Sequence, residues 1–195
     1  MRPVLFAWLI LSPAFLLAQA TNIEEVGKSP VEAKFAAGGQ VRMDLCPSGV
    51  ELVGKDEGML SVNYDSKGDH DDVKVWLQVA GNRARIRVTE CPHNNFRLTI
   101  AVPKSADLHV RMSAGDLQIE GITGNKDVEL HAGQLTVDMG QSEDYAHVDA
   151  SVLTGELEAS PFGVSKGGLF RSFHRNGGGK YRLHAHVGAG QIHLR

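Results

Sequence analysis

The chain of 195 residues carries a formal net charge of −3; 42% of its residues are hydrophobic, 22% are charged and 22 residues are glycine. This length is enough for one domain with a single buried core. The aliphatic content and low net charge exclude a disordered chain, the lack of a basic excess argues against a nucleic-acid binder, and glycine without a G-X-Y period excludes collagen. We therefore expect one domain with many tight turns.

Residues 1–20 have the three parts of a secretory signal peptide. Arg2 precedes an apolar run over residues 4–17, and Ala18-Gln19-Ala20 has the small-x-small form of a cleavage site. The run is shorter than the roughly 20 residues needed to cross a membrane, although a retained anchor is the alternative. We predict cleavage after Ala20, export to the periplasm or the cell surface, and no stable membrane span after cleavage.

Residues 21–38 are interpreted as an N-terminal lead-in to a single domain over residues 39–195. From Gly39 onward, apolar and polar residues alternate in short runs that Gly, Asn, Asp or Pro bound, as in β-strands. These runs cover residues 41–45, 60–64, 73–79, 83–89 and 96–102. No window of twelve residues has a clean helical pattern. The sequence therefore predicts an all-β protein.

Cys46 and Cys91 are the two cysteines of the chain. In an oxidising compartment, one disulfide bridge is the simplest use of an even number of cysteines. Closing a loop of about 45 residues would stabilise the fold by roughly 4 kcal/mol in the chain-entropy treatment. The alternatives are two free thiols or half of a metal site, but there is no CxxC spacing to support zinc. We predict the disulfide.

The second half of the sequence contains a repeat centred on four glycines, Gly115, Gly133, Gly155 and Gly190. Apolar residues alternate before each glycine, and the alternation resumes after it with a shift of one residue, as in Met112 and Leu117. Neighbouring positions of an uninterrupted strand face opposite sides. The shift therefore predicts that the chain turns a corner at each glycine, which has the necessary backbone freedom.

A repeat of about 20 residues is typical of a single-stranded β-solenoid, or β-helix-like coil, in which each rung covers the edge of the next. An evenly spaced β-sandwich is the alternative. Outward positions fit stacked rungs: Arg111 and Glu129 occupy the same place before their glycines and should be neighbours.

The corner segments VRMSAGDLQIEGITG, VELHAGQLTVD, SVLTGELEAS and HAHVGAGQIHLR resemble the bacterial putative-adhesin family. The resemblance covers about residues 39–195 and is strongest from Leu108 onward. It implies a right-handed β-solenoid, an envelope or extracellular location, and no established enzymatic activity or catalytic residue set. The sequence departs from the repeat in an insertion near residues 161–181.

The insertion contains aromatic and basic residues in close succession, namely Phe170, Arg171, Phe173, His174 and Arg175. One hypothesis is a partner-binding loop with aromatic anchors. The other is a cap that covers the open edge of the last rungs, and the two are compatible.

Three histidines form a weak metal candidate. His184 and His186 share one face of a strand, and His193 also faces outward. Imidazoles of this kind bind zinc or copper. Histidine on a polar strand face is more often only a polar residue, and the sequence assigns no acidic ligand to this group, so we expect no metal or other cofactor.

The sequence favours a non-enzymatic, exported structural or interaction module of the bacterial cell envelope. Its expected partner is an envelope or extracellular protein or a glycan, and no nucleic acid. The alternative is a carbohydrate-binding or polysaccharide-acting β-helix protein. Metal binding through histidines is the weaker alternative.

Overall fold

The computed structural model describes residues 20–56, 58–65, 72–92 and 96–195, so the predicted signal peptide lies outside the described residues. The prediction of an all-β protein is confirmed by one 13-stranded sheet. The strands are β1 (Thr21–Val26), β2 (Val31–Lys34), β3 (Gln40–Leu45), β4 (Ser48–Lys55), β5 (Met59–Tyr64), β6 (Lys74–Ala80), β7 (Arg83–Thr89), β8 (Arg97–Pro103), β9 (Asp107–Glu120), β10 (Lys126–Val137), β11 (Tyr145–Ala159), β12 (Val164–Asn176) and β13 (Tyr181–Leu194). Two 3-10 turns, η1 (Ser142–Asp144) and η2 (Ser160–Phe162), lie on either side of β11. The described ranges contain no helix of the length and hydropathy that a membrane span requires.

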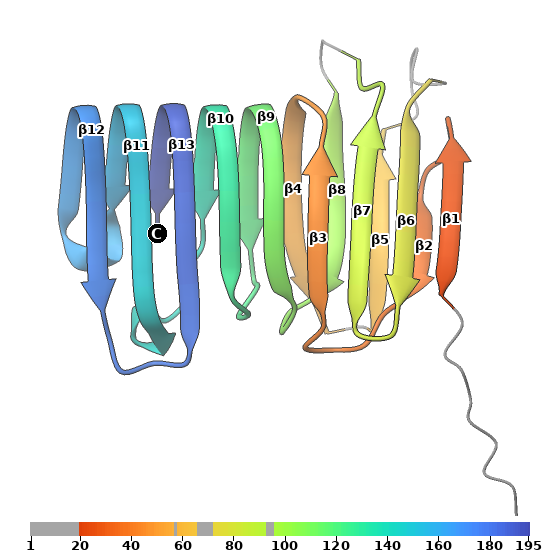
Figure 1. The fold of residues 1–195 in the computed structure, drawn as a ribbon, viewed down its shortest axis with the longest axis horizontal. Helices are drawn as coiled ribbons and strands as arrows, with labels where there is room; N and C mark the ends of the chain where they lie inside the picture. The colour runs from red at the N-terminus through yellow and green to blue at the C-terminus, as the bar shows by residue number, and fades with distance from the viewer. Residues whose placement is uncertain (1–19, 57, 66–71, 93–95) are drawn as a thin grey trace, which may run out of the picture.

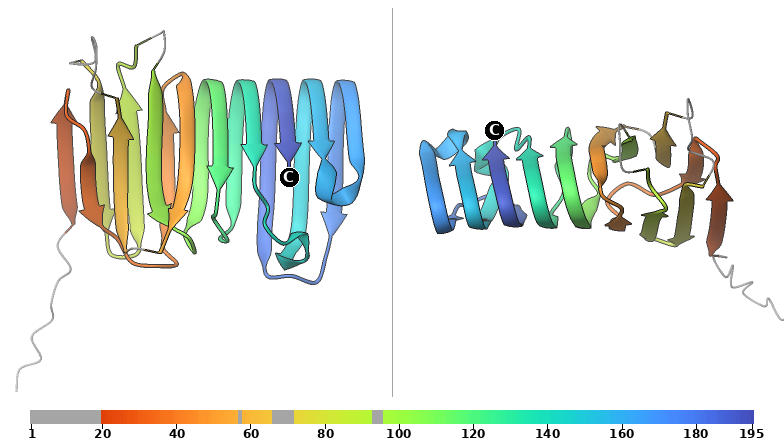
Figure 2. Two further views of the ribbon diagram at one scale, coloured as in Figure 1. Left: turned by 180° about the vertical axis from the view of Figure 1, so that it is seen from behind. Right: turned by 90° about the horizontal axis from the view of Figure 1, so that it is seen from above.

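The strands form two walls that face each other across the core (Figure 1). The first wall contains β1, β6, β7 and β3, and the second contains β2, β5, β8 and β4. β9 joins them, because its N-terminal half pairs with β3 and its C-terminal half pairs with β4. The right view of Figure 2, seen from above, shows the two walls as separate layers. Two facing walls also give the layered core of the sandwich alternative.

The long strands β9, β10, β13 and β11 pass from the first wall to the second at glycines in register. Gly133 pairs with Gly115 on one side and with Gly190 on the other, and Gly190 pairs with Gly155. All four have a φ between 119° and 142°. A Cβ atom on Gly133 would collide with the carbonyl oxygen of Gly115. Both the backbone conformation and the close stacking of the levels therefore require glycine here.

The levels do not follow one another in chain order. β13 lies between β10 and β11, and β12 runs antiparallel to β11 at the end of the sheet. Of the glycine spacings in the sequence, the steps from Gly115 to Gly133 and from Gly155 to Gly190 join neighbouring levels, whereas the step from Gly133 to Gly155 does not. The connection through η1 leads from β10 to β11, which are not neighbours in the sheet. β13, which follows later in the chain, occupies the place between them. Hydrophobic alternation does not distinguish these orders, because it is the same for every partner strand.

Residues 21–38 belong to the same sheet rather than preceding it. β1 pairs with β6, and β2 pairs with β5. Val31 and Phe35 are 3% exposed and contribute to the same hydrophobic core as the later strands. The predicted lead-in is therefore the first level of the two-walled stack.

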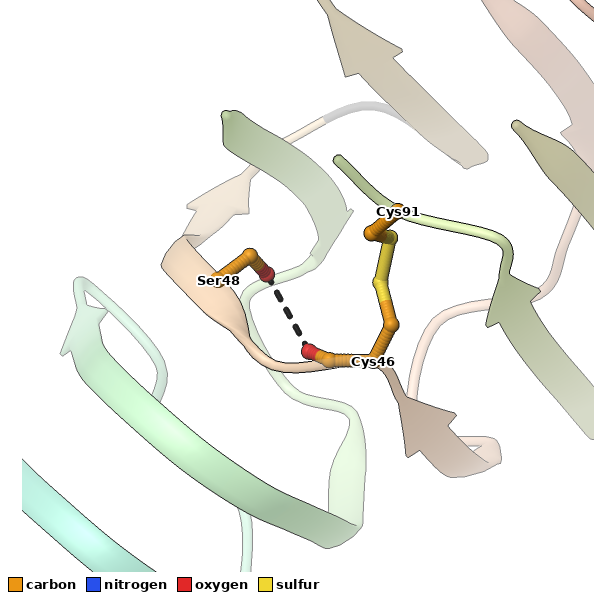
Figure 3. The surroundings of a disulfide bond; sticks show 3 residues. All are labelled: Cys46, Ser48 and Cys91. Atoms are coloured by element: carbon orange, nitrogen blue, oxygen red, sulfur yellow. Dashed lines mark hydrogen bonds between the residues drawn. A yellow bond between two sulfur atoms is a disulfide. The ribbon is translucent and has the colours of Figure 1, made fainter. Parts of the chain in front are cut away.

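The predicted disulfide is confirmed: Cys46 is bonded to Cys91 with a Cα–Cα distance of 6.0 Å. Cys46 lies at the crossing from β3 to β4, and Cys91 follows β7 on the way to β8 (Figure 3). Ser48 Oγ donates a hydrogen bond to the Cys46 carbonyl oxygen at 3.2 Å. Since β3 pairs with β7 and β4 pairs with β8, the disulfide links the crossings of two neighbouring levels.

Candidate functional site

The outer face of the first wall carries a transverse row of ionisable side chains at its C-terminal end. Successive strands place His109, Asp127, His184, Asp149 and His174 at matching positions in the register. The next residue on each of the first four strands is buried in the core. The row therefore faces outward, and it alternates histidine with aspartate across five strands. We refer to these five residues as the histidine–aspartate row.

Asp127 is held between two histidines of the row. Its carboxylate accepts a hydrogen bond from Nδ1 of His109 at 2.6 Å and another from Nδ1 of His184 at 2.8 Å. Partial burial raises the pKa of Asp127, but the hydrogen bonds from His184 and His109 outweigh it, so that the pKa is lowered overall. The carboxylate is thus stabilised in its charged form.

The outer end of the row forms a compact group with a further histidine. One potential ligand atom from each of His147, Asp149 and His174 lies within 4.8 Å of the other two. Nδ1 of His147 donates to Oδ1 of Asn176 at 2.9 Å. His174 Nδ1 is 3.7 Å from the Asp149 carboxylate, and the rings of His147 and His174 meet edge to face with centroids 4.6 Å apart.

The structure does not bring together the three histidines of the sequence-based metal candidate. His184 belongs to the row, whereas His186 Nδ1 is 2.9 Å from the Ser151 hydroxyl. His193 lies beyond the corner at Gly190, on the second wall, where it contacts Glu158 at 3.2 Å. The acidic partners that the sequence did not assign come from neighbouring strands.

The insertion forms η2 and β12, the strand at the end of the sheet. The rings of Phe162 and Phe173 stack with centroids 5.1 Å apart, and the Arg175 guanidinium lies 4.4 Å from the centroid of the Phe162 ring. These groups cover the end of the core. Leu169 and Phe170, in contrast, are 63% and 77% exposed near the corner of the strand, which leaves an apolar contact surface. Arg171 Nε donates to the carbonyl oxygen of Gly167 at 2.8 Å.

A groove of about 720 Å³ lies in the other half of the first wall. Arg42, Arg83 and Arg85 line it, and Arg42 pairs with Arg85 across β3 and β7. All three are exposed, and none makes an ion pair within the described residues. The sequence analysis missed this arginine groove because β3 and β7 lie far apart in the chain.

The expected neighbours Arg111 and Glu129 are confirmed as a pair, with a nitrogen–oxygen distance of 3.2 Å. They lie on the same face of the first wall as the histidine–aspartate row, two residues after His109 and Asp127 on β9 and β10. Their pairing contrasts with the arginine groove, whose three arginines form no ion pair with a carboxylate in the part of the chain that the structure describes.

Lys126 is a buried cation that the sequence analysis did not single out. It is 1% exposed, and its Nζ donates to the Tyr145 hydroxyl at 2.7 Å and to the Gly124 carbonyl oxygen at 3.1 Å. Burial lowers the pKa of Lys126 to about 8, although Asp138 and Asp107 partly counteract it. Burial also raises the pKa of Tyr145 to about 12, with smaller contributions from the charges of Asp138 and Asp144.

The fold is similar to that of a bacterial protein of known structure. A protein from Clostridium sporogenes ATCC 15579, described as a putative cell adhesion protein, matches with a TM-score of 0.50 and 12% identity over 90% of this chain and 99% of that chain. A putative adhesin from Bacteroides fragilis NCTC 9343 gives a TM-score of 0.35 and 11% identity over 90% of this chain and 97% of that one. No protein-family model and no curated protein sequence matches. At these identities the likeness concerns the fold alone.

Proposed function

We propose that this protein is an exported, non-enzymatic, adhesin-like interaction module of the bacterial cell envelope, built as a β-solenoid. Three observations support the proposal: the fold likeness to the Clostridium sporogenes protein, the signal-like sequence of residues 1–20, and the disulfide between Cys46 and Cys91, a bond that persists in oxidising compartments. A stack of paired strands gives such a module a rigid surface on which side chains keep fixed spacings.

The arginine groove carries this proposal. Like charges placed opposite each other on neighbouring strands destabilise a sheet, and Arg42 and Arg85 are placed in this way. Arg83 adds a third positive charge to the same groove. Carboxylates of a bound partner would offset this repulsion, so the groove suits an acidic protein or glycan.

The partner's affinity should come from several weak charge pairs. An exposed pair contributes about 0.2–1 kcal/mol and is screened by salt. Replacing one arginine should therefore weaken binding by up to about 5-fold. Replacing two should have a visibly larger effect if both contact the same partner.

Binding to an acidic polysaccharide tests the proposal. The purified protein is titrated onto polygalacturonate at low and high salt, with neutral dextran as the comparison. We expect salt-sensitive binding to polygalacturonate alone and a loss of about 10-fold in the double variant Arg42→Gln/Arg85→Gln. Arg111→Gln is the matched control, because Arg111 lies on the same wall but is paired with Glu129. Equal binding of the wild type and the double variant would contradict the role of the groove.

The groove also favours a second candidate, a carbohydrate-binding or polysaccharide-acting protein. Asp107 and Asn125 line it beside the arginines and offer hydrogen-bonding groups for sugar hydroxyls. The chain length of polygalacturonate after incubation tests the polysaccharide-acting form of this candidate. Shortened chains would support a polysaccharide-acting enzyme, whereas bound but intact chains would contradict it.

A further inference from the structure

The group formed by His147, Asp149 and His174 contains the ligand types that late divalent transition metals prefer, two imidazoles and one carboxylate. The ligand atoms around a tetrahedral zinc ion lie about 3.4 Å apart, given metal–ligand bonds of about 2.0–2.2 Å. The corresponding atoms here lie within 4.8 Å of one another before any ion is bound. Small side-chain rotations would bring them to the distances needed for coordination.

Backbone pairing fixes the positions of these residues. His147 and Asp149 are two residues apart on β11 and therefore face the same side of the wall. Asp149 is directly opposite His174 on the antiparallel strand β12, and His147 is opposite Asn176. The three side chains thus come from neighbouring positions on two paired strands.

Asn176 prepares His147 for metal binding. The hydrogen bond from Nδ1 of His147 to Oδ1 of Asn176, at 2.9 Å, places the ring proton on Nδ1 and leaves the lone pair of Nε2 available. Histidine ligands in metal sites usually donate their second ring nitrogen to a polar partner in the same way, which fixes both tautomer and ring orientation.

The charges beside the group come from β13. Arg182 is opposite His147, and His184 is opposite Asp149 in the parallel register. Nδ1 of His184 already donates to Asp127 at 2.8 Å. The Asp149 carboxylate therefore faces His174 of β12 as its nearer histidine partner. The exposed Arg182 opposes a cation, and removing its charge should tighten metal binding.

We propose that His147, Asp149 and His174 form a binding site for a divalent transition-metal ion of the zinc type, with Asn176 as a positioning residue. The ion bridges β11 and the terminal strand β12. It therefore stabilises the attachment of β12, which pairs with β11 alone among the described strands. This site is separate from the arginine groove, and either can fail without the other.

Calorimetric titration with Zn²⁺ tests the site in protein purified without a polyhistidine tag. We expect one site that is tighter than any other. Loss of a residue that orients a ligand typically lowers metal affinity by roughly 10- to 100-fold. We expect a loss of Zn²⁺ affinity in this range for Asn176→Ala. The loss should be larger for each ligand variant, namely His147→Ala, His174→Ala and Asp149→Asn. Arg182→Gln should tighten it.

His186→Ala is the matched control, because His186 lies on the same wall and contacts Ser151 instead of the group. It should keep the tight site. Asp149→Asn preserves the shape of the side chain, and the melting temperature of each metal-free variant verifies its folding. The proposal is overturned if folded variants of the group bind Zn²⁺ as the wild type does, or if His186→Ala removes the tight site.

Hydrogen exchange gives a second readout. Zn²⁺ should slow exchange of the β12 amides near His174 in the wild type and leave it unchanged in His174→Ala. Faster or unchanged exchange in the wild type at saturating Zn²⁺ would overturn the proposed bridge between the two strands.

Discussion

The two halves of the molecule make the same crossing between walls by different means. In the C-terminal half, β9, β10, β13 and β11 cross without interruption at glycines in register. In the N-terminal half, the pairs β3–β4 and β7–β8 cross at loops that contain Cys46 and Cys91, which the disulfide joins. Ser48 stands next to Gly115 in the register, where the two halves meet.

The two halves therefore hold neighbouring levels together at the crossings in different ways. The C-terminal half uses glycines, and the N-terminal half uses a disulfide. Where the backbones of neighbouring levels touch, as at Gly133, no side chain fits. At the crossings that contain Cys46 and Cys91, side chains are present, and the disulfide joins the two neighbouring levels there.

The largest expected effect comes from breaking the glycine stack. Gly133→Val should lower the free energy of unfolding by at least about 5 kcal/mol, because it combines a strained φ of 127° with a collision against the Gly115 backbone. Urea denaturation of the purified variant measures this loss. Gly140→Ala is the control: its φ is also positive, at 62°, but no atom lies within 4 Å of the added methyl group, so a loss of about 1–2 kcal/mol is expected. Similar losses in the two variants would contradict the importance of the stack.

Removing the disulfide tests the other half. The double variant Cys46→Ala/Cys91→Ala should lose up to about 4 kcal/mol of unfolding free energy, because the unfolded chain regains the freedom of the loop. Hydrogen exchange should quicken more at β3 and β7 than at β10 and β13. Equal loss of protection in all four strands would show that the two halves do not differ in the way proposed.

The pH dependence of stability sharpens the comparison within the core. Lys126 interrupts an otherwise apolar column in which Leu108 and Leu183 are its neighbours. Its pKa is about 8 in the folded chain and 10.5 at its ordinary value, so the unfolded chain binds more protons between these values. The free energy of unfolding should therefore rise with pH in this window, by about 2 kcal/mol from pH 7 to pH 9.5.

Denaturation of Lys126→Met at the same pH values measures this contribution. The variant should lack the rise, whereas Lys104→Met, which removes a partly exposed lysine, should keep it. Above pH 10 the wild type should lose stability again, because the pKa of Tyr145, raised to about 12, keeps it neutral in the folded chain while it ionises in the unfolded one. A flat profile for the wild type would contradict the burial of a charged Lys126.

The strands, the disulfide and the neighbouring pair of Arg111 and Glu129 could be predicted from the sequence because each depends on local alternation or on cysteine number. The order of the levels could not, since alternation does not say which strand lies beside which. A usable signal was present six residues before each corner glycine. The residues there, in chain order, are His109, Asp127, Asp149 and His184.

Stacked in chain order, these residues would place Asp127 beside Asp149, which is unfavourable for like charges on neighbouring strands. With β13 between β10 and β11, every aspartate of the row instead has a histidine on each side. The observed order is therefore the one that this column of charges favours. The site at His147 needed one further fact, the antiparallel return of β12, which the sequence pattern does not contain.

The place of β13 also constrains how the chain can fold as it is synthesised. β11 and β12 can form their hairpin early, but they have no parallel partner until β13 is available to pair with both β10 and β11. Such late pairing of segments distant in sequence is slow, because loop closure precedes any gain from contacts. The hairpin of β11 and β12 therefore stays separate from the rest of the sheet until β13 has been made, and β13 then joins the two parts.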